Sequence, residues 1–258
     1  MRRLTMALAL AVTAAGAARA QTDDLARRVT SAAGASVAFE FPARAGVCGD
    51  GRSFIRVGAN SFMGNWNGRQ RDTTACVAGP VRVVVRKTDG AVASLRYAVG
   101  PVPDDGATEL GLVTAAAGAG FLLDLAARES DRTASDAIPA ALLGEGVNAA
   151  PRLLAIARAR PASRRGDRHE PLFWAGRYAA ARLRGADTPF ADDGCPDDDK
   201  REAVFALSQM RGDDAVPALI DVVRRNADAC VRGSALFWLV ESGDARALDV
   251  VASILGEK

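Results

Sequence analysis

Residues 201–225, REAVFALSQMRGDDAVPALIDVVRR, decide the fold, because residues 233–257, GSALFWLVESGDARALDVVASILGE, repeat their pattern 32 positions later. A fixed period of this length is typical of proteins built from stacked helical repeats. The apolar positions recur in register along both stretches, as in these matched pairs: Ala203 with Ala235, Leu207 with Leu239, Ala215 with Ala247, and Leu219 with Val251.

Each copy is predicted to form two helices joined by a tight turn. Gly212-Asp213 and Gly243-Asp244 interrupt the apolar pattern, and an aspartate at such a place can cap the next helix. Pro217 falls in the first turn of a second helix. Proline is tolerated there because the first amides of a helix have no intrahelical partner to lose.

Earlier copies are eroded. Leu172-Phe173-Trp174 stands 32 positions before Val204-Phe205-Ala206, and weaker matches extend the repeats back to about Ser135. After a predicted helix over 170–183, residues 185–200 replace the expected second helix. They hold prolines, a glycine and many aspartates, so we expect a loop there.

The pattern resembles HEAT repeats, and most closely the bacterial subtype named for its similarity to phycobilisome lyases. The resemblance covers about Asp199 to Leu255 and implies an α-helical solenoid with a concave binding face. Repeat stacks of this kind host many unrelated functions, so it implies a fold and leaves the partner open. The residues that carry it are Arg201 to Leu207, Gly212 to Leu219, Val231-Arg232, Ala235, Leu239 and Gly243-Asp244.

The first residues have the layout of a secretory signal peptide. Arg2 and Arg3 precede an apolar run, and Ala18-Arg19-Ala20 is a small-x-small cleavage pattern. We expect cleavage after Ala20 and a periplasmic or secreted protein. The apolar run is too short for a permanent membrane span, and no later segment has the roughly 18 apolar residues that a span needs.

Residues 21–103 are predicted to form a small antiparallel β domain preceded by a short helix at 23–32. Asp89-Gly90 between two strand-like runs is a strong hairpin signal. The Pro- and Gly-rich stretch 100–106 is the expected linker to the helical domain, 104–258, whose first helix is expected from Thr108 to about Arg128. The predicted class is therefore α+β by segments.

Cys48, Cys76, Cys195 and Cys230 are the four cysteines. An oxidising compartment favours disulfides, and their distribution favours Cys48 with Cys76 and Cys195 with Cys230, although four cysteines allow three connectivities. A zinc site is the alternative. No pair has CxxC spacing and the chain has one histidine, so no metal or other cofactor is predicted.

Composition and motifs argue against several functions. A formal net charge of +2 lacks the concentrated basic surface that nucleic-acid binding needs. His169 lies beside Asp167 and Glu170, but local sequence supplies no nucleophile, and the ordinary start of a repeat helix explains it. No enzyme is predicted. The acidic run Asp192, Asp193, Asp197, Asp198 and Asp199 could bind calcium, or be a solvated loop whose last aspartates stabilise a helix N-terminus.

Two groups of residues are candidate binding surfaces. The second helices of HEAT-like units usually line the concave face, which nominates Arg152, Arg158, Asp221, Arg224 and Arg225 as protein-binding, with a solvated helix face as the alternative. Asn65-Trp66-Asn67 could present an aromatic ring to a small ligand or glycan, or bury it.

The aromatic residues of the repeats are predicted to be core wedges between hairpins, because they recur in the repeat phase. They are Phe173, Trp174, Phe205, Phe237 and Trp238.

The sequence thus predicts a non-enzymatic exported scaffold that binds a protein or peptide. Two alternatives stay open: an enzyme or cofactor handler related to lyase-type repeats, and a β domain that binds a small ligand or glycan.

Overall fold

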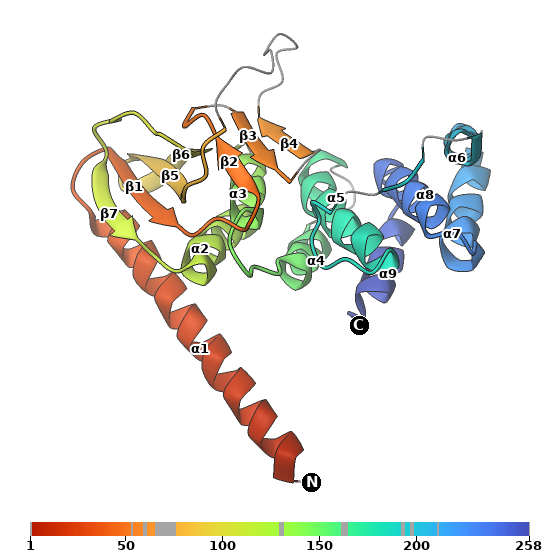
Figure 1. The fold of residues 1–258 in the computed structure, drawn as a ribbon, viewed down its shortest axis with the longest axis horizontal. Coiled ribbons are helices and arrows are strands. Elements are labelled where there is room, and N and C mark those ends of the chain that lie inside the picture. Colours follow the sequence, from red (N-terminus) through yellow and green to blue (C-terminus); the bar gives the residue numbers. More distant parts are fainter. Residues whose placement is uncertain are drawn as a thin grey trace. The chain divides into compact units, whose positions relative to one another are not determined.

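The computed structural model describes residues 2–52, 54–58, 61–64, 76–128, 132–160, 165–191, 194–196, 199–210 and 212–257. The chain forms two compact units, residues 1–147 and 148–258. The first unit combines strands with helices, and the second is helical among its described residues (Figure 1). The fold is therefore mixed α+β, as the sequence predicts.

The first unit is built on a four-stranded sheet of order β6-β5-β1-β7. Strands β5 (Val81–Thr88) and β6 (Ala91–Val99) form the hairpin predicted at Asp89-Gly90, both of which have positive φ. Such φ values give a turn whose twist matches that of the strands. Strand β1 (Ser36–Phe41) pairs antiparallel with β5 but parallel with β7 (Thr108–Leu112), so the sheet is mixed and the prediction of an antiparallel domain was incomplete.

Three helices accompany this sheet: α1 (Arg2–Ser31), α2 (Ala115–Arg128) and α3 (Arg132–Leu142). α2 packs against α1, α3 and β1, and α3 also packs against β6. Alternate side chains of β1 supply the core, where Phe39 meets Phe121 of α2 edge to face with ring centroids 5.6 Å apart. A half-buried sheet must bury this apolar face, and α2 covers it here.

Two glycines let α2 approach its neighbours closely. A Cβ at Gly118 would lie 2.5 Å from Cδ1 of Phe41, and one at Gly120 would lie 2.3 Å from Oγ1 of Thr22 on α1. Glycine weakens an isolated helix. Here it removes the side chain at the two points where α2 meets β1 and α1.

A second sheet, of order β2-β3-β4, completes this unit. Its strands are β2 (Val47–Gly49), β3 (Phe54–Val57) and β4 (Ser61–Gly64), all antiparallel. Cys48 of β2 is bonded to Cys76, and Val77 pairs with Gly49 in an isolated bridge. The disulfide therefore joins this sheet to the segment that leads into β5, with the pairing that the sequence predicts.

The stretch predicted as a domain linker lies inside the first unit. Residues 100–107 return the chain to the sheet, where β7 pairs with β1, and α2 begins only at Ala115. The compact units divide at residue 147 instead of 103. The physical reason is that β7, α2 and α3 complete the sheet and its core, which ties residues 104–147 to the first unit.

The second unit contains α4 (Ala150–Ala159), α5 (Arg165–Leu183), α6 (Asp199–Ser208), a 3-10 turn (Gly212–Asp214), α7 (Ala215–Arg225), α8 (Ala229–Glu241) and α9 (Arg246–Leu255). The pairs α6 with α7 and α8 with α9 are the two helical hairpins that the 32-residue repeat predicts. Each has its turn at the predicted glycine and aspartate.

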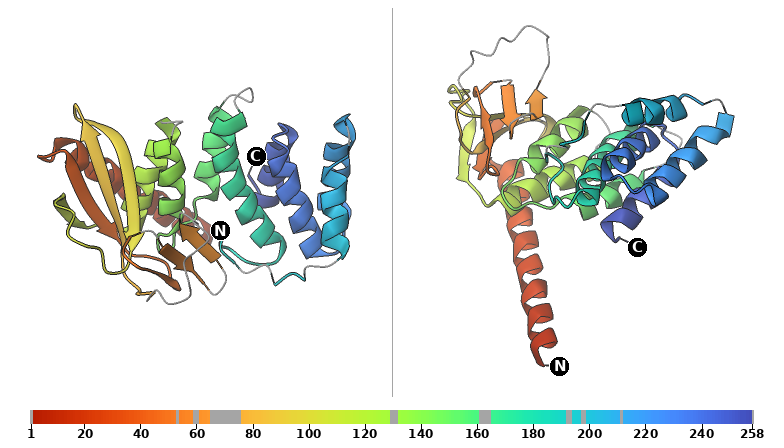
Figure 2. Two further views of the ribbon diagram at one scale, coloured as in Figure 1. Left: turned by 90° about the horizontal axis from the view of Figure 1, so that it is seen from above. Right: turned by 45° about the vertical axis from the view of Figure 1, so that its right-hand side comes forward.

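These hairpins do not stack in chain order. α8 packs against α5 on one side and against α6 and α7 on the other, and α9 also packs against α5 and α4 (Figures 1 and 2). The last hairpin of the chain thus lies between α5 and the preceding hairpin. We call the described residues between α5 and α6, 184–191 and 194–196, the crossover. They contain no helix, so within these residues the expected second helix is absent.

The directions of the helices also show that α5 does not stack on α8 as the equivalent helix of a preceding repeat. His169, near the start of α5, meets Glu241 at the end of α8, and a Cβ at Gly233 near the start of α8 would lie 2.9 Å from Nη1 of Arg184 just past α5. α5 and α8 are therefore antiparallel. α6 and α8 run parallel, as equivalent helices of consecutive repeats should, since Lys200 contacts Asp228 and Phe205 contacts Trp238.

Candidate interaction surface

Three aromatic side chains, Phe205, Phe237 and Trp238, form what we call the aromatic ridge on α6 and α8. The ring of Trp238 lies 5.0 Å from Phe205 and 5.0 Å from Phe237, centroid to centroid. Phe205 is 45% exposed and Phe237 is 42% exposed. The prediction that they are core wedges is therefore wrong for these two phenylalanines, which leave much of their rings at the surface.

The position of α6 explains the exposure of Phe205. α6 lies at the edge of the helical unit, and Val204 is its one buried residue (Figure 2). Met210, just after α6, is also 44% exposed. The spacing and residue type of Phe205 are those of a buried repeat position. The order of the hairpins in the chain does not show which of them lies at the edge, so the exposure of Phe205 could not be predicted from its position in the repeat.

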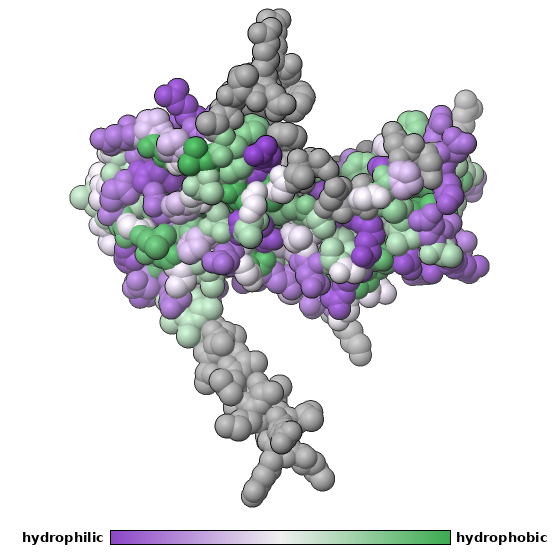
Figure 3. All heavy atoms as spheres, in the orientation of Figure 1, coloured by the Kyte–Doolittle hydropathy of each residue, from purple (hydrophilic) through white to green (hydrophobic). Residues whose placement is uncertain are grey.

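The residues of α6 nevertheless indicate that this helix lies at the edge of the helical unit. Gly233 and Val240 of α8 face α5, and the repeat-equivalent positions of α6 are Arg201 and Ser208. Polar residues at these positions suit a terminal repeat, which must present a polar outer face to water. In Figure 3, hydrophilic side chains gather along this edge of the helical unit.

The aromatic residues of α5 form a separate group. Phe173 stacks on His169 with centroids 6.1 Å apart and meets Trp174 edge to face at 5.3 Å. Nε1 of Trp174 donates to Oε1 of Glu170 at 2.7 Å, and its ring lies 5.7 Å from Phe190. Phe173 and Trp174 are half-buried and Phe190 is buried, so these rings are less exposed than Phe205 and Phe237.

His169 has a structural contact that the sequence did not suggest. Its Nε2 lies 3.1 Å from Oε1 of Glu241, which joins the start of α5 to the end of α8. Both side chains are about one third exposed. This contact gives the histidine a place in the packing of α5 against α8.

The five residues predicted for a concave face fall into two groups. Arg152 and Arg158 lie on α4, and Asp221, Arg224 and Arg225 lie on α7; all are exposed. Oδ1 of Asp221 accepts from Nε of Arg225 at 3.0 Å, one helical turn away. α8 and α9 separate the two groups in Figures 1 and 2, so the structure does not bring the five residues together.

Two predicted sites fall wholly or largely outside the described residues. The candidate ligand loop Asn65-Trp66-Asn67 is one of them. Of the acidic run, Asp199 opens α6 and Asp192, Asp193, Asp197 and Asp198 are not described. Within the described ranges, no three His, Cys, Asp or Glu side chains are grouped as metal ligands. Nor does any described helix combine the length and apolar composition of a membrane span.

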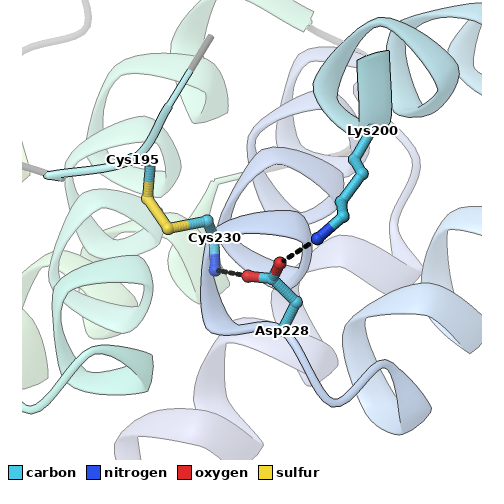
Figure 4. Close-up of a disulfide and its surroundings, with 4 residues drawn as sticks. All are labelled: Cys195, Lys200, Asp228 and Cys230. Carbon is cyan, nitrogen blue, oxygen red and sulfur yellow. Dashed lines mark hydrogen bonds and ion pairs between the residues drawn. A yellow bond between two sulfur atoms is a disulfide. The ribbon is translucent and has the colours of Figure 1, made fainter. Parts of the chain in front are cut away.

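The second disulfide joins the crossover to α8, one of the two helices that carry the aromatic ridge. Cys195 in the crossover is bonded to Cys230 in the first turn of α8, again the predicted pair (Figure 4). Asp228 caps α8 by accepting from the backbone N–H of Cys230 at 2.9 Å, and its other oxygen accepts from Nζ of Lys200 on α6 at 3.0 Å. The hydrogen bond from Lys200, followed by that from Cys230, lowers the pKa of Asp228.

In the first unit the main charged cluster surrounds Arg82 of β5. Its guanidinium contacts Glu109, Asp105 and Glu40, the last two at 3.1 and 3.5 Å, while its side chain is 10% exposed. The hydrogen bond with Glu109 is the largest effect on Arg82 and exceeds the cost of burial, so the pKa of Arg82 is raised. Arg82 is thus a largely buried cation matched by three carboxylates, and through Glu40 and Glu109 it joins β5 to β1 and β7.

Comparison with known proteins supports the repeat. The family model described as PBS lyase HEAT-like repeat matches residues 199–225, which are α6, the 3-10 turn and α7. This match covers one helical hairpin, which is similar to a HEAT-like repeat. No curated protein and no solved structure matches the chain.

Proposed function

We propose that this chain is a non-enzymatic, exported interaction scaffold whose helical unit binds a protein partner through the aromatic ridge. The observation that carries the proposal is that Phe205 and Phe237 are 45% and 42% exposed on either side of Trp238. The match to a HEAT-like repeat favours a protein partner, because stacked helical repeats present extended surfaces of this kind.

The surroundings of the ridge have the composition of a protein interface. Polar residues lie three and four positions from Phe205, on α6 or directly after it: Arg201, Glu202, Ser208 and Gln209. Polar groups therefore border an aromatic centre. Binding energy in protein interfaces concentrates in aromatic side chains that a polar rim shields from water. Mixed charge in that rim favours a polypeptide over a polyanion such as nucleic acid.

The test is quantitative capture from envelope extract and from culture medium, with the purified chain as bait. We expect a partner retained by the wild type to be lost by F205S/F237S, with a free-energy penalty of about 2 kcal/mol or more for each dominant ring. The matched control is L112S, which removes an apolar side chain that is 67% exposed on β7 in the other unit.

A second variant separates the ridge from the predicted concave-face residues. R224E/R225E reverses two charges on α7 and leaves the aromatic rings in place. If F205S/F237S keeps every partner while R224E/R225E loses one, the ridge is not the binding surface. If all the variants bind alike, the helical unit is not the binding unit and the proposal fails.

A further inference from the structure

The disulfide between Cys195 and Cys230 encloses one complete helical hairpin. The two cysteines are 35 positions apart, and α6, the 3-10 turn and α7 lie between them. α7 is anchored by buried Ala215, Leu219 and Val223. α6 buries Val204 alone, so α6 depends on other contacts to stay against α8.

Two of these contacts meet at the start of α8. Lys200 in the first turn of α6 pairs with Asp228, the cap of α8, and Cys195 is bonded to Cys230 two residues further on (Figure 4). The third contact, between Phe205 and Trp238, is part of the aromatic ridge. The Lys200 and Asp228 side chains are 63% and 37% exposed, and an ion pair that is open to solvent holds a helix weakly.

The disulfide shortens the tether of α6. Asp199 opens α6 four positions after Cys195, which keeps it within about 14 Å of the bonded cysteine at full extension. Without the bond, the tether runs from Leu183 at the end of α5, sixteen positions away, and reaches about 55 Å. The crossover alone therefore cannot hold the N-terminal end of α6 on α8, while the other end stays joined in the chain to α7, which itself packs against α8.

We propose that the Cys195–Cys230 disulfide is a redox-sensitive latch that holds α6 against α8 and thereby assembles the aromatic ridge. Opening it releases α6 and exposes Trp238 while α7, α8 and α9 stay folded. The latch controls the aromatic ridge and, as a regulator of binding, it rests on the proposed function. The contacts from which the latch is inferred involve no partner.

The bond is placed for thiol exchange. Cys195 is half-buried between exposed Gly194 and Pro196. The thiolate of a dithiol reductant attacks Cys195 Sγ, the S–S bond breaks, and Cys230 leaves as a thiolate that takes up a proton. The second thiol of the reductant then displaces Cys195, which gives two cysteine thiols and a cyclic disulfide of the reductant. The positive end of α8 stabilises the departing Cys230 thiolate.

The experiment uses the full chain with W66F/W174F, so that Trp238 is the one remaining tryptophan. Reduction with a dithiol, or the substitution C195S/C230S, is expected to shift Trp238 emission to longer wavelength and to speed amide exchange in α6 at least 10-fold. Exchange in α7 and α9 should stay within about 2-fold. C48S/C76S, which removes the other disulfide, is the matched control and should leave α6 unchanged.

Two outcomes overturn the latch. In the first, α6 exchange and Trp238 emission do not change on reduction. In the second, α6, α7 and α9 all accelerate together, which makes the disulfide a brace for the whole unit. If C195S/C230S does not fold, reduction of the folded chain decides the same question. None of these readouts requires a partner, so the latch and the proposed binding function can fail separately.

Discussion

Phe205 of α6 packs against Trp238 of α8 with ring centroids 5.0 Å apart, yet its own ring stays 45% exposed. The contact ties two parallel helices of consecutive repeats, and the exposure follows from α6 being the edge helix. Phe205 therefore packs against the neighbouring repeat and also forms part of the exposed surface.

Truncation of Phe205 should cost much less stability than truncation of the buried Leu219. F205A loses a side chain that is nearly half exposed, so we expect about 1–2 kcal/mol from the apolar area and the ring contact with Trp238. L219A opens a cavity at a residue that is 0% exposed and should cost about 2–5 kcal/mol. Urea unfolding followed by circular dichroism measures both. Equal losses would show that Phe205 is a core residue.

Replacement of Gly120 should destabilise the first unit although alanine is the better helix former. A Cβ at Gly120 would lie 2.3 Å from Oγ1 of Thr22, which is too close for any real contact. Overpacking of this kind costs about 1–3 kcal/mol and alanine gains roughly 1 kcal/mol over glycine in an open helix, so we expect G120A to be less stable than the wild type by up to about 2 kcal/mol.

The matched rescue for G120A is T22A/G120A, which removes the hydroxyl and methyl that the new Cβ meets. Thermal unfolding should show recovery of part of the loss in the double variant. G120A as stable as the wild type would mean that α1 and α2 do not approach at this point.

Asp105 should contribute to stability only above the acid range. Burial raises its pKa, but hydrogen bonds from Arg82 and from the backbone of Ala107 outweigh burial, so the pKa lies below its ordinary value of 3.8. The ionised carboxylate therefore stabilises the fold fully above about pH 4, and this contribution is lost as pH falls through the folded-state pKa. Each unit of depression is worth about 1.4 kcal/mol.

D105N should accordingly show a smaller loss of unfolding free energy between about pH 4 and pH 2 than the wild type, and lower stability at pH 7. D89N, at an exposed position of the β5–β6 turn, is the control for loss of one carboxylate. Chemical unfolding at a series of pH values measures the slopes. An identical slope for D105N and wild type would exclude coupling between Asp105 and Arg82.

Export predicts a defined mature N-terminus. Expression of the full chain with its leader in a bacterium should yield protein that starts at Gln21, as read by intact mass and N-terminal sequencing. Cleavage removes Arg19, whose Nη1 pairs with Asp124 at 2.9 Å, but Arg19 is 56% exposed and its loss should cost no more than about 1 kcal/mol. A chain that retains residues 1–20 in the envelope would contradict the predicted cleavage.

Much of the local structure was predictable from the sequence, because its determinants are local. The hairpins α6 with α7 and α8 with α9 follow from apolar periodicity interrupted at Gly212-Asp213 and Gly243-Asp244. The β5–β6 turn follows from Asp89-Gly90, whose backbone conformation a two-residue hairpin needs. The two cysteine pairs follow from their distribution between the halves of the chain.

Three features were decided by tertiary structure. β7 joins the sheet in parallel, residues 104–147 belong to the first unit, and the last hairpin lies between α5 and α6. An apolar pattern shows which face of an element is buried, but not which distant element covers it. The short segment 108–112 illustrates this, since Gly111 marks an irregular pairing with β1 that an isolated five-residue strand could not specify.

The candidate surface likewise depends partly on the sequence and partly on the tertiary structure. The sequence by itself determined the 32-residue repeat, and it therefore shows that Phe205 and Phe237 occupy equivalent positions of consecutive repeats. Only the tertiary structure decided that both rings remain partly exposed, because the exposure of each ring depends on which helices lie beside α6 and α8. Arg201 and Ser208 are polar where α8 has Gly233 and Val240, and this difference is consistent with an edge position for α6. It can be interpreted in this way only once the neighbour of each helix is known.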